Sequence, residues 1–320
     1  MRATARAQPN IALIKYWGKR DRGRNLPAVG SISITLDELF TEMQVDLDAG
    51  EQRDRLLVNG LEDRQMLPRV SRCLDSVGGP GRPAAVVRST CNFPIAAGLA
   101  SSAAAFAALV VAADAALAGS RDTAQLASLA GQASGSAARS LYGGFVELTN
   151  RDDDISVQSL LAGDGWPLKV VVAITTPSRK AVASGEAMEI SRKTSPFFGR
   201  WVDQQAEDLD EAREAIEARD FARLGAVAEH NCLKMHSVMW ASRPPMIYWN
   251  SATLACMQVV RELQSAGVAV FFTIDAGPQL KAVCLPNDEA RVSEALAATN
   301  GVSNVMVSGL GAGARRVNAA

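Results

Sequence analysis

Asn92–Ala104, with the sequence NFPIAAGLASSAA, has the clearest capacity for chemistry in this chain. A turn that contains Pro94 and Gly98 leads into a helix predicted to begin at Ser101–Ser102. The unpaired N–H groups and the positive dipole end of a helix N-terminus favour phosphate, and small residues let the backbone approach the anion. The stretch contains neither a Walker A loop nor a G-x-G-x-x-G fingerprint. The pattern leaves two interpretations open, a phosphate site and a serine-capped helix packed in a core.

Asn10–Lys19 (NIALIKYWGK) places two lysines, Lys15 and Lys19, beside the aromatic pair Tyr16–Trp17. A lysine ammonium is a compact, strongly hydrated charge that suits phosphates. The end of a strand with solvated lysines accounts for the same pattern, and charge alone favours this simpler interpretation.

Ser134–Gly144 (SGSAARSLYGG) surrounds one arginine, Arg139, with small residues and hydroxyls. The planar fork of a guanidinium matches a carboxylate or a phosphate. A surface arginine beside a flexible turn is the alternative. We treat Arg139 as a candidate for binding an anion.

Thr273–Pro278 (TIDAGP) places Asp275 at the end of an apolar strand and directly before a turn. A carboxylate at the mouth of a buried strand is well placed to have a perturbed pKa. The alternative is an Asx-type turn in which Asp275 only caps its own backbone.

Other mechanisms find little support in the sequence. The two histidines, His230 and His236, are six positions apart on a predicted helix, do not share a face as i and i+4 do, and are predicted to be structural. No H-E-x-x-H or G-x-S-x-G motif occurs. Five scattered cysteines without a C-x-x-C pair predict reduced thiols in a cytosol rather than disulfides or a zinc site.

The composition limits the class of protein. The chain has 320 residues, enough for one large domain or two interlocked ones, with 48% hydrophobic and 21% charged residues, as in a soluble globular protein. A net charge of −1 argues against a large basic surface for binding nucleic acid or a membrane. An anionic ligand must therefore bind where positive side chains gather locally. No apolar run reaches the roughly 20 residues of a membrane span, and the N-terminus lacks an apolar signal core.

The elements that must position these residues follow from hydrophobic periodicity and turn signals. Strands are predicted at Ile32–Leu36, Glu42–Leu47, Ala84–Thr90, Phe145–Leu148, Leu168–Ile174, Val268–Ile274, Leu280–Leu285 and Val302–Val307. Helices are predicted at Ser101–Ala118, Thr123–Gln132, Ala183–His236 with a break near Pro196, Tyr248–Ala266 with Gly267 as its C-cap, and Asp288–Ala298. Irregular mixing of strands and helices predicts an α+β protein, with a boundary near residue 175.

The four stretches, taken together and in this order, resemble the diphosphomevalonate decarboxylases of the GHMP kinase superfamily. The resemblance covers most of the chain and also includes NLPAVGSISITL, FVEL after the arginine stretch, and PPMIYWN after His236. The segments KYWGK, GLASSAA, GSAxRSLYGG and DAGP are close to diagnostic in combination, whereas other GHMP kinases share only the glycine–serine phosphate loop.

The resemblance implies the GHMP kinase fold, an α+β architecture with a ribosomal S5-like N-terminal half and a ferredoxin-like C-terminal half. We expect an N-terminal domain at residues 1–175, a C-terminal domain at residues 176–320, and an active site in the cleft between them. The resemblance further implies ATP and Mg²⁺, a small-molecule substrate, a homodimer and a cytoplasmic location, with neither nucleic acid nor membrane as a partner.

The implied reaction is ATP-dependent phosphorylation of the C3 hydroxyl of mevalonate 5-diphosphate, followed by loss of phosphate and CO₂ to give isopentenyl diphosphate. Asp275 is carried over as the catalytic carboxylate that orients or deprotonates this hydroxyl. Lys15 is placed beside the reacting hydroxyl and phosphoryl group, and Arg139 on the substrate carboxylate.

The remaining implied contacts divide between substrate and nucleotide. Tyr16 and Lys19 are placed on the substrate diphosphate, Ser136 on the substrate, and Ser184 near the phosphates and the catalytic aspartate. The nucleotide phosphates are placed on four residues of the phosphate loop, with the Ser102 hydroxyl near Mg²⁺: Gly98, Ala100, Ser101 and Ser102.

The sequence departs from the family pattern at three places. Ile95 stands where threonine is common, Ala138 where cysteine is frequent, and Ala183 replaces the first of a serine pair. None of these changes removes a charged catalytic group, although the last weakens the assignment of Ser184.

Three alternatives stay open at this point. A decarboxylase of mevalonate 5-phosphate shares the chemistry, although Lys19 and Tyr16 favour the diphosphate. A mevalonate 3-kinase that does not decarboxylate is expected to lack the aspartate, and a non-catalytic binding protein is expected to lack Lys15, Arg139 or Asp275. All three residues are present.

Overall fold

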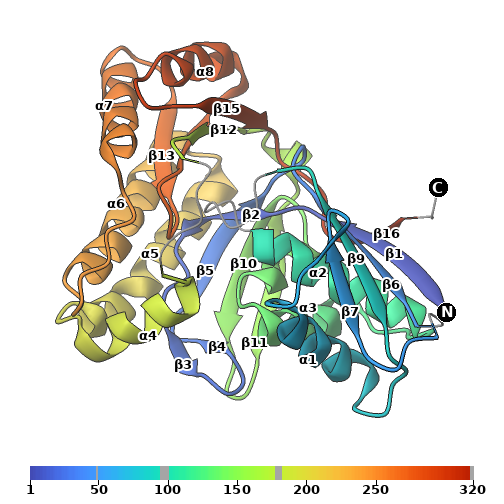
Figure 1. Cartoon of the computed structure of the whole chain (residues 1–320). Coiled ribbons are helices and arrows are strands. Elements are labelled where there is room, and N and C mark those ends of the chain that lie inside the picture. Colours follow the sequence, from blue (N-terminus) through green and yellow to red (C-terminus); the bar gives the residue numbers. More distant parts are fainter. Residues whose placement is uncertain (48–49, 94–100, 177–181, 318–320) are drawn as a thin grey trace.

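The computed structural model describes residues 1–47, 50–93, 101–176 and 182–317. In these ranges the chain forms two larger sheets in its N-terminal part and one sheet in its C-terminal part, with helices around them (Figure 1). Gly98 and Ala100, two predicted nucleotide contacts, lie outside the described residues.

The first sheet has the strand order β16-β1-β6-β9-β7-β8. Its strands are β1 (Arg2–Ala7), β6 (Thr41–Asp46), β7 (Arg55–Val58), β8 (Leu61–Glu62), β9 (Val86–Cys91) and β16 (Arg315–Val317). The second sheet, β11-β10-β5-β2, consists of β2 (Asn10–Ile14), β5 (Ser31–Thr35), β10 (Phe145–Asn150) and β11 (Ile155–Leu161). A short hairpin joins β3 (Lys19–Asp21) and β4 (Leu26–Pro27).

The N-terminal helices are α1 (Leu67–Gly78), α2 (Ser101–Ala116), α3 (Thr123–Ala133) and the 3₁₀ turn η1 (Ala137–Leu141).

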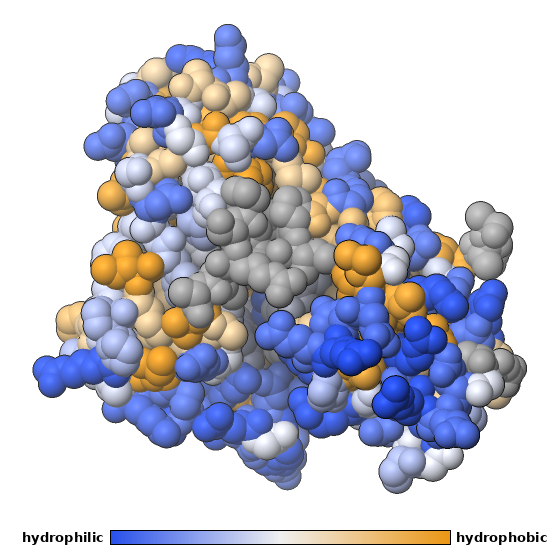
Figure 2. All heavy atoms as spheres, viewed as in Figure 1, coloured by the Kyte–Doolittle hydropathy of each residue, from blue (hydrophilic) through white to orange (hydrophobic). Residues whose placement is uncertain are grey.

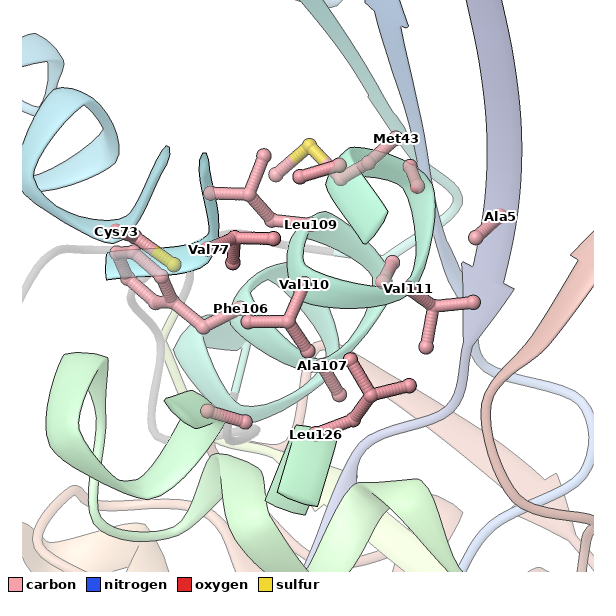
Figure 3. Close-up of a cluster of buried hydrophobic side chains, with 14 of the residues drawn as sticks. Ala5, Met43, Cys73, Val77, Phe106, Ala107, Leu109, Val110, Val111 and Leu126 are labelled. Atoms are coloured by element: carbon pink, nitrogen blue, oxygen red, sulfur yellow. The ribbon is translucent and has the colours of Figure 1, made fainter. Parts of the chain in front are cut away.

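Helix α2 lies at the centre of the N-terminal core. It is apolar and largely buried around its circumference, as expected of a helix enclosed by other elements. Figure 3 shows its side chains, including Phe106, Leu109 and Val110, among residues from α1, α3 and the first sheet. This packing anchors the helix whose N-terminus the family resemblance assigns to the nucleotide phosphates.

The C-terminal part contains the third sheet, ordered β13-β14-β12-β15. Its strands are β12 (Lys169–Ile174), β13 (Val270–Ile274), β14 (Leu280–Cys284) and β15 (Asn304–Ser308). The helices of this part are α4 (Ser184–Thr194), α5 (Phe198–Ala218), α6 (Phe221–Trp240), α7 (Ser251–Ser265) and α8 (Glu289–Ala297), and two 3₁₀ turns are η2 (Gly163–Gly165) and η3 (Pro286–Asp288). Because β12 pairs with β14 and β15, and β16 pairs with β1, the chain crosses between the two parts more than once. The division at residue 175 stays a prediction.

The third sheet is buried on both faces, which follows from the alternation of side chains along a strand. Val171 and Ala173 of β12 pack with α7 and α8, whereas Val170 and Val172 pack with α5, α6 and the second sheet. This shared core holds the second and third sheets against each other. Residues at the ends of β2 and β13 therefore have defined relative positions.

The predicted strands and helices are found close to their expected bounds, with these differences. Helix α6 continues to Trp240, beyond the predicted end at His236. Helix α1 and strands β1, β7 and β11 have no predicted counterpart. The helical stretch at 183–236 is broken a second time, because Arg219 has a left-handed φ of 53° and the Asp220 side chain caps Arg223 N–H at the start of α6. Helix α7 begins at Ser251 rather than Tyr248, because Asn250 forms a capping box with Thr253. Gly267 follows α7 with a φ of 80°, in agreement with its predicted role as a helix stop.

Candidate active site

Asp275 lies at the end of β13 with a lysine on each carboxylate oxygen. Lys15, directly after β2, places Nζ 2.7 Å from Oδ1, and Lys281 of β14 places Nζ 3.1 Å from Oδ2. The side chains of Lys15 and Lys281 are 1% and 0% exposed, whereas that of Asp275 is 24% exposed. The carboxylate is thus held by two buried ammonium groups and keeps an open side.

These lysines determine the charge of the carboxylate. Burial of Asp275 raises its pKa, but the two ammonium groups outweigh burial and hold the pKa well below its usual range. Burial also lowers the pKa of Lys281, and Asp275 opposes this shift. Asp275 is therefore ionised at neutral pH.

The backbone of Lys15 is fixed by side chains from two helices. Its N–H donates to Oδ1 of Asn231 on α6 at 2.7 Å, and its carbonyl accepts from Nε2 of Gln205 on α5 at 2.9 Å. Asn231 in turn donates to Oε1 of Gln205 at 3.0 Å. Since buried polar groups that are fully paired rigidify their surroundings, this network sets the position from which Lys15 reaches Asp275.

Arg139 of η1 is buried, with 2% exposure, contrary to the alternative of a surface arginine. Its guanidinium donates to neutral side chains: Ser31 Oγ at 2.6 Å, Ser33 Oγ at 3.0 Å and Asn10 Oδ1 at 3.1 Å. Within the described part of the chain, no carboxylate forms an ion pair with it. Burial lowers its pKa to about 10, so it still carries its charge at neutral pH. A buried cation without an anionic partner is costly, and an incoming anion would compensate it.

Tyr16 lies beside Arg139, with the guanidinium carbon 5.9 Å from the ring centroid. The Tyr16 hydroxyl is buried and has no hydrogen-bond partner among the described residues. Burial raises its pKa to about 12 against the opposing effect of Arg139. The hydroxyl faces Gly135, where a Cβ atom would come within 2.2 Å of it, and half-buried Ser136 follows directly.

Lys19, the first residue of β3, lies near the start of α4. A Cβ atom at Gly185 would be 3.6 Å from Lys19 Nζ, which places the lysine close to Ser184, the first residue of that helix. Burial lowers the pKa of Lys19, and the nearby charges of Arg69 and Arg22 lower it further. Arg69 and Arg22 therefore add positive charge around Lys19, and Glu189 opposes their effect.

Helix α2 begins at Ser101, and both Ser101 and Ser102 are half-buried. Its first turn contains no acidic residue, so the positive end of its dipole is not neutralised from within the helix. This end fits a phosphate group. Among the described residues, no group of three or more His, Cys, Asp or Glu could hold a metal. Mg²⁺ fits such a site as an ion held mainly by phosphates, as it is in many phosphoryl-transfer enzymes.

Several residues of this site were not identified from the sequence. Lys281 was not identified. Its place inside the apolar stretch Leu280–Leu285 could have indicated it, because a buried lysine needs a partner. Asn10, Ser31 and Ser33, which hold Arg139, carry no local signal that links them to it.

His236, predicted to be structural, is buried with Nε2 3.1 Å from the Ile274 carbonyl, and burial lowers its pKa to about 3.

Comparison with known families covers nearly the whole chain. Residues 7–159 match the diphosphomevalonate decarboxylase-like N-terminal domain, and residues 170–313 match the mevalonate 5-diphosphate decarboxylase C-terminal domain. The chain is 33% identical to the diphosphomevalonate decarboxylase of Candida albicans, over 86% of this chain and 82% of the relative. It is also 33% identical to that of Homo sapiens, over 86% of this chain and 74% of the relative.

Solved structures agree with this assignment. Mevalonate diphosphate decarboxylase from Staphylococcus aureus superposes with a TM-score of 0.92 at 34% identity, covering 99% of this chain and 98% of that one. A chain described as MDDEF in complex with MVAPP, AMPPCP and magnesium gives a TM-score of 0.92 at 33% identity, covering 100% of this chain and 99% of that one. The α+β GHMP kinase fold expected from the sequence is confirmed. The chain belongs to the diphosphomevalonate decarboxylase family.

Proposed function

We propose that this protein is an ATP-dependent decarboxylase that converts mevalonate 5-diphosphate to isopentenyl diphosphate, with ADP, phosphate and CO₂ as the other products. The observation that carries the proposal is the ionised Asp275 between Lys15 and Lys281, together with the buried, carboxylate-free Arg139. The family relationship supports the same reaction, since relatives named diphosphomevalonate decarboxylase match over most of their length.

The chemistry follows from the poor leaving ability of hydroxide. The C3 hydroxyl oxygen attacks the γ-phosphorus of ATP, and the bond from that phosphorus to ADP breaks. The C3–O bond then breaks with its electron pair on the departing phosphate. The electron pair of the C1–C2 bond forms the C2=C3 double bond, and the carboxylate leaves as CO₂. The hydroxyl proton ends on the released phosphate or in solvent.

Asp275 acts on this hydroxyl as an orienting and electrostatic group. A carboxylate whose pKa is held far below neutrality is a poor general base, because catalysis by a base is most effective when its pKa is near the operating pH. Phosphoryl transfer depends mainly on positioning and electrostatic stabilisation. We therefore assign Asp275 the role of accepting the hydroxyl hydrogen bond, and Lys15 that of stabilising charge on the transferred phosphoryl group.

The substrate contacts follow the distribution of charge. Arg139 holds the C1 carboxylate, since it is buried, charged and bonded to neutral groups. Lys19 and Tyr16 hold the diphosphate, with Ser136 beside Tyr16 and Ser184 beside Lys19. These contacts suit a molecule that carries both a carboxylate and phosphates.

The nucleotide phosphates are proposed to bind at the N-terminus of α2 through Ser101, Ser102 and the preceding Gly98 and Ala100. Ser102 is the proposed protein ligand of Mg²⁺. The metal, when bound, neutralises phosphate charge during transfer. The serines hold and orient the phosphates for attack by the C3 hydroxyl.

We also propose that the protein is a cytoplasmic homodimer. The three residues Trp240, Ile247 and Leu254 expose 38%, 68% and 51% of their surfaces between the end of α6 and the first turns of α7. Figure 2 shows hydrophobic groups interspersed among hydrophilic ones on one face of the molecule. A second copy of the chain would cover the exposed apolar groups of this segment. None of the described helices is long and apolar enough to cross a membrane.

The decisive experiment supplies the purified protein with ATP, Mg²⁺ and, separately, mevalonate, its 5-phosphate and its 5-diphosphate. Release of CO₂ and ADP in equal amounts with the diphosphate supports the proposal. ADP formation without CO₂ would identify a 3-kinase, and preference for the monophosphate would identify the related decarboxylase. Light scattering at several concentrations tests the dimer in the same preparation.

A further inference from the structure

Lys281 is an unusual residue for the middle of a buried strand. It lies on β14, where the side chains of all five residues are buried, and its neighbours Leu280, Ala282 and Cys284 belong to a hydrophobic core. Burial of an ammonium group is costly unless a partner of opposite charge compensates it. The Asp275 carboxylate, with Oδ2 3.1 Å from Nζ, is such a partner.

The pairing of β13 with β14 places this lysine at the reaction site. Lys281 stands opposite Thr273, and residues directly opposite in an antiparallel pair project to the same face. Thr273 Oγ1 donates to the Ala12 carbonyl at 3.3 Å, and Lys15 Nζ donates to the same carbonyl at 2.8 Å. Lys281 therefore projects toward β2, where Lys15 and Asp275 meet.

Neutralisation of Asp275 does not require this second lysine. Lys15 already forms a close ion pair with the carboxylate, at 2.7 Å. With Lys281 the cluster carries one excess positive charge, and buried Arg139 adds another nearby. A purely structural ion pair would be balanced, whereas an excess of buried positive charge suits a site that receives polyanions.

The two lysines also restrict the carboxylate geometrically. Lys15 donates a hydrogen bond to Oδ1, and Lys281 forms an ion pair with Oδ2 at 3.1 Å, so rotation of the carboxylate group would lengthen one contact or the other. Reacting groups must be held within a few tenths of an ångström, and small misplacements are costly for the rate.

We propose that Lys281 is a positioning residue for the phosphoryl-transfer step, which it serves by holding the second carboxylate oxygen of Asp275 in the orientation that receives the C3 hydroxyl. The proposal rests on the function assigned above. Lys281 acts through Asp275, and no contact of Lys281 with the substrate is required.

A change in pH dependence distinguishes this role from a merely structural one. Among the described residues, the charged and titratable groups around Asp275 are Lys15, Lys281, Arg139 of η1, and Cys232 and His236 of α6. Burial raises the pKa of Cys232 and lowers the pKa of His236 to about 3, so both are neutral at neutral pH. Loss of Lys281 removes one cation that lowers the Asp275 pKa, so this pKa must rise.

The test compares Lys281→Met and Lys281→Gln with the wild type. We expect kcat to fall by about 10²-fold in Lys281→Met while the KM for ATP stays within a factor of two or so. The acid limb of the kcat profile should move to higher pH in both variants. Lys281→Gln, which keeps an N–H donor for Oδ2, should retain more of kcat than Lys281→Met.

Lys169→Met is the matched control. It removes a half-buried lysine from β12 of the same sheet, where Lys169 Nζ lies 3.7 Å from Glu289. Its kcat and its pH profile should match those of the wild type. Carbon NMR titration of the Asp275 carboxyl, assigned with Asp275→Asn, measures the same shift without turnover. The NMR measurement therefore tests the role of Lys281 even if the wild type does not decarboxylate mevalonate 5-diphosphate. That failure would overturn the proposed function, not the role of Lys281.

Wild-type kcat and an unmoved acid limb in folded Lys281→Met would overturn the proposal. If Lys281→Met does not fold, Lys281→Gln decides by the same two measurements. An unchanged carboxyl titration in Lys281→Gln would likewise show that Lys281 only fills a place in the core.

Discussion

Nζ of Lys15 lies 2.7 Å from Oδ1 of Asp275, although the two residues are 260 positions apart in the chain. Lys15 follows a strand of the second sheet, and Asp275 follows a strand of the third. The contact forms only where these two sheets share a core, which includes Ile11 of β2 and Phe271 of β13. The site is therefore a product of the junction between the two parts of the molecule, and its residues can be tested singly.

Asp275→Asn keeps the size of the side chain but removes its charge. We expect kcat to fall by at least about 10³-fold, because electrostatic and proton-transfer contributions are typically 10²–10⁴-fold each. ATP binding should be nearly unchanged. Rapid quench with labelled ATP, run in parallel with CO₂ capture, should show both steps falling together. Brisk phosphorylation without CO₂ release would assign Asp275 to the second step, and survival of both steps would make it a turn residue.

Arg139→Met removes the proposed partner of the substrate carboxylate. A hydrogen bond to a charged group contributes roughly 1.5–3 kcal/mol, so substrate affinity should fall by about tenfold to a hundredfold. Calorimetric titration with mevalonate 5-diphosphate measures this loss directly. Arg139→Lys keeps the charge but not the fork, and it should bind with intermediate affinity. Unchanged affinity in Arg139→Met would place the carboxylate elsewhere.

Lys19→Met tests the choice between the diphosphate and the monophosphate. The wild type should turn over the diphosphate with the higher kcat/KM, because Lys19, Arg22 and Arg69 bring three positive charges together against the single negative charge of Glu189. Removal of the Lys19 charge should reduce kcat/KM for the diphosphate more than for the monophosphate. Steady-state assays with both substrates check this, and equal losses would show that Lys19 does not distinguish them.

Gly135→Ala tests the position of Tyr16 without changing any charge. The new methyl group would come within 2.2 Å of the Tyr16 hydroxyl, so the ring must move. We expect the KM for the phosphorylated substrate to rise while the KM for ATP is unchanged. Gly185→Ala is the matched control, because its methyl group would meet Lys19 Nζ at an ordinary 3.6 Å. Equal kinetics in the two variants would exclude a substrate role for Tyr16.

Ser101→Ala and Ser102→Ala test the proposed nucleotide site at the start of α2. Each change removes a hydroxyl but leaves the backbone N–H donors, and a hydrogen bond to a charged group contributes roughly 1.5–3 kcal/mol. The loss should appear in ATP affinity, in kcat or in both, with an unchanged melting temperature. Ser128→Ala on α3, where the serine bonds to Asp154, serves as a control. Wild-type kinetics in both α2 variants would show that these serines do not bind the nucleotide and that the helix serves only in packing.

The sequence alone determined much of this protein. The order of its motifs indicated the family and the α+β fold, and local patterns placed half of the strands and most of the helices in the described residues within a few residues. Asp275 could be located at a strand end because the apolar run before it and the glycine and proline after it are adjacent in the chain. Patterns of this kind depend on neighbouring residues, which periodicity and turn chemistry reveal.

Only the tertiary structure decided which groups meet. Arg139 is held by Asn10, Ser31 and Ser33, which come from two strands of the second sheet, and Lys281 faces Asp275 through the register of β13 with β14. Strand register is set by long-range pairing and by the shape of the shared core. A buried charge and its partner are therefore recognisable as such only when the sheets that carry them have come together.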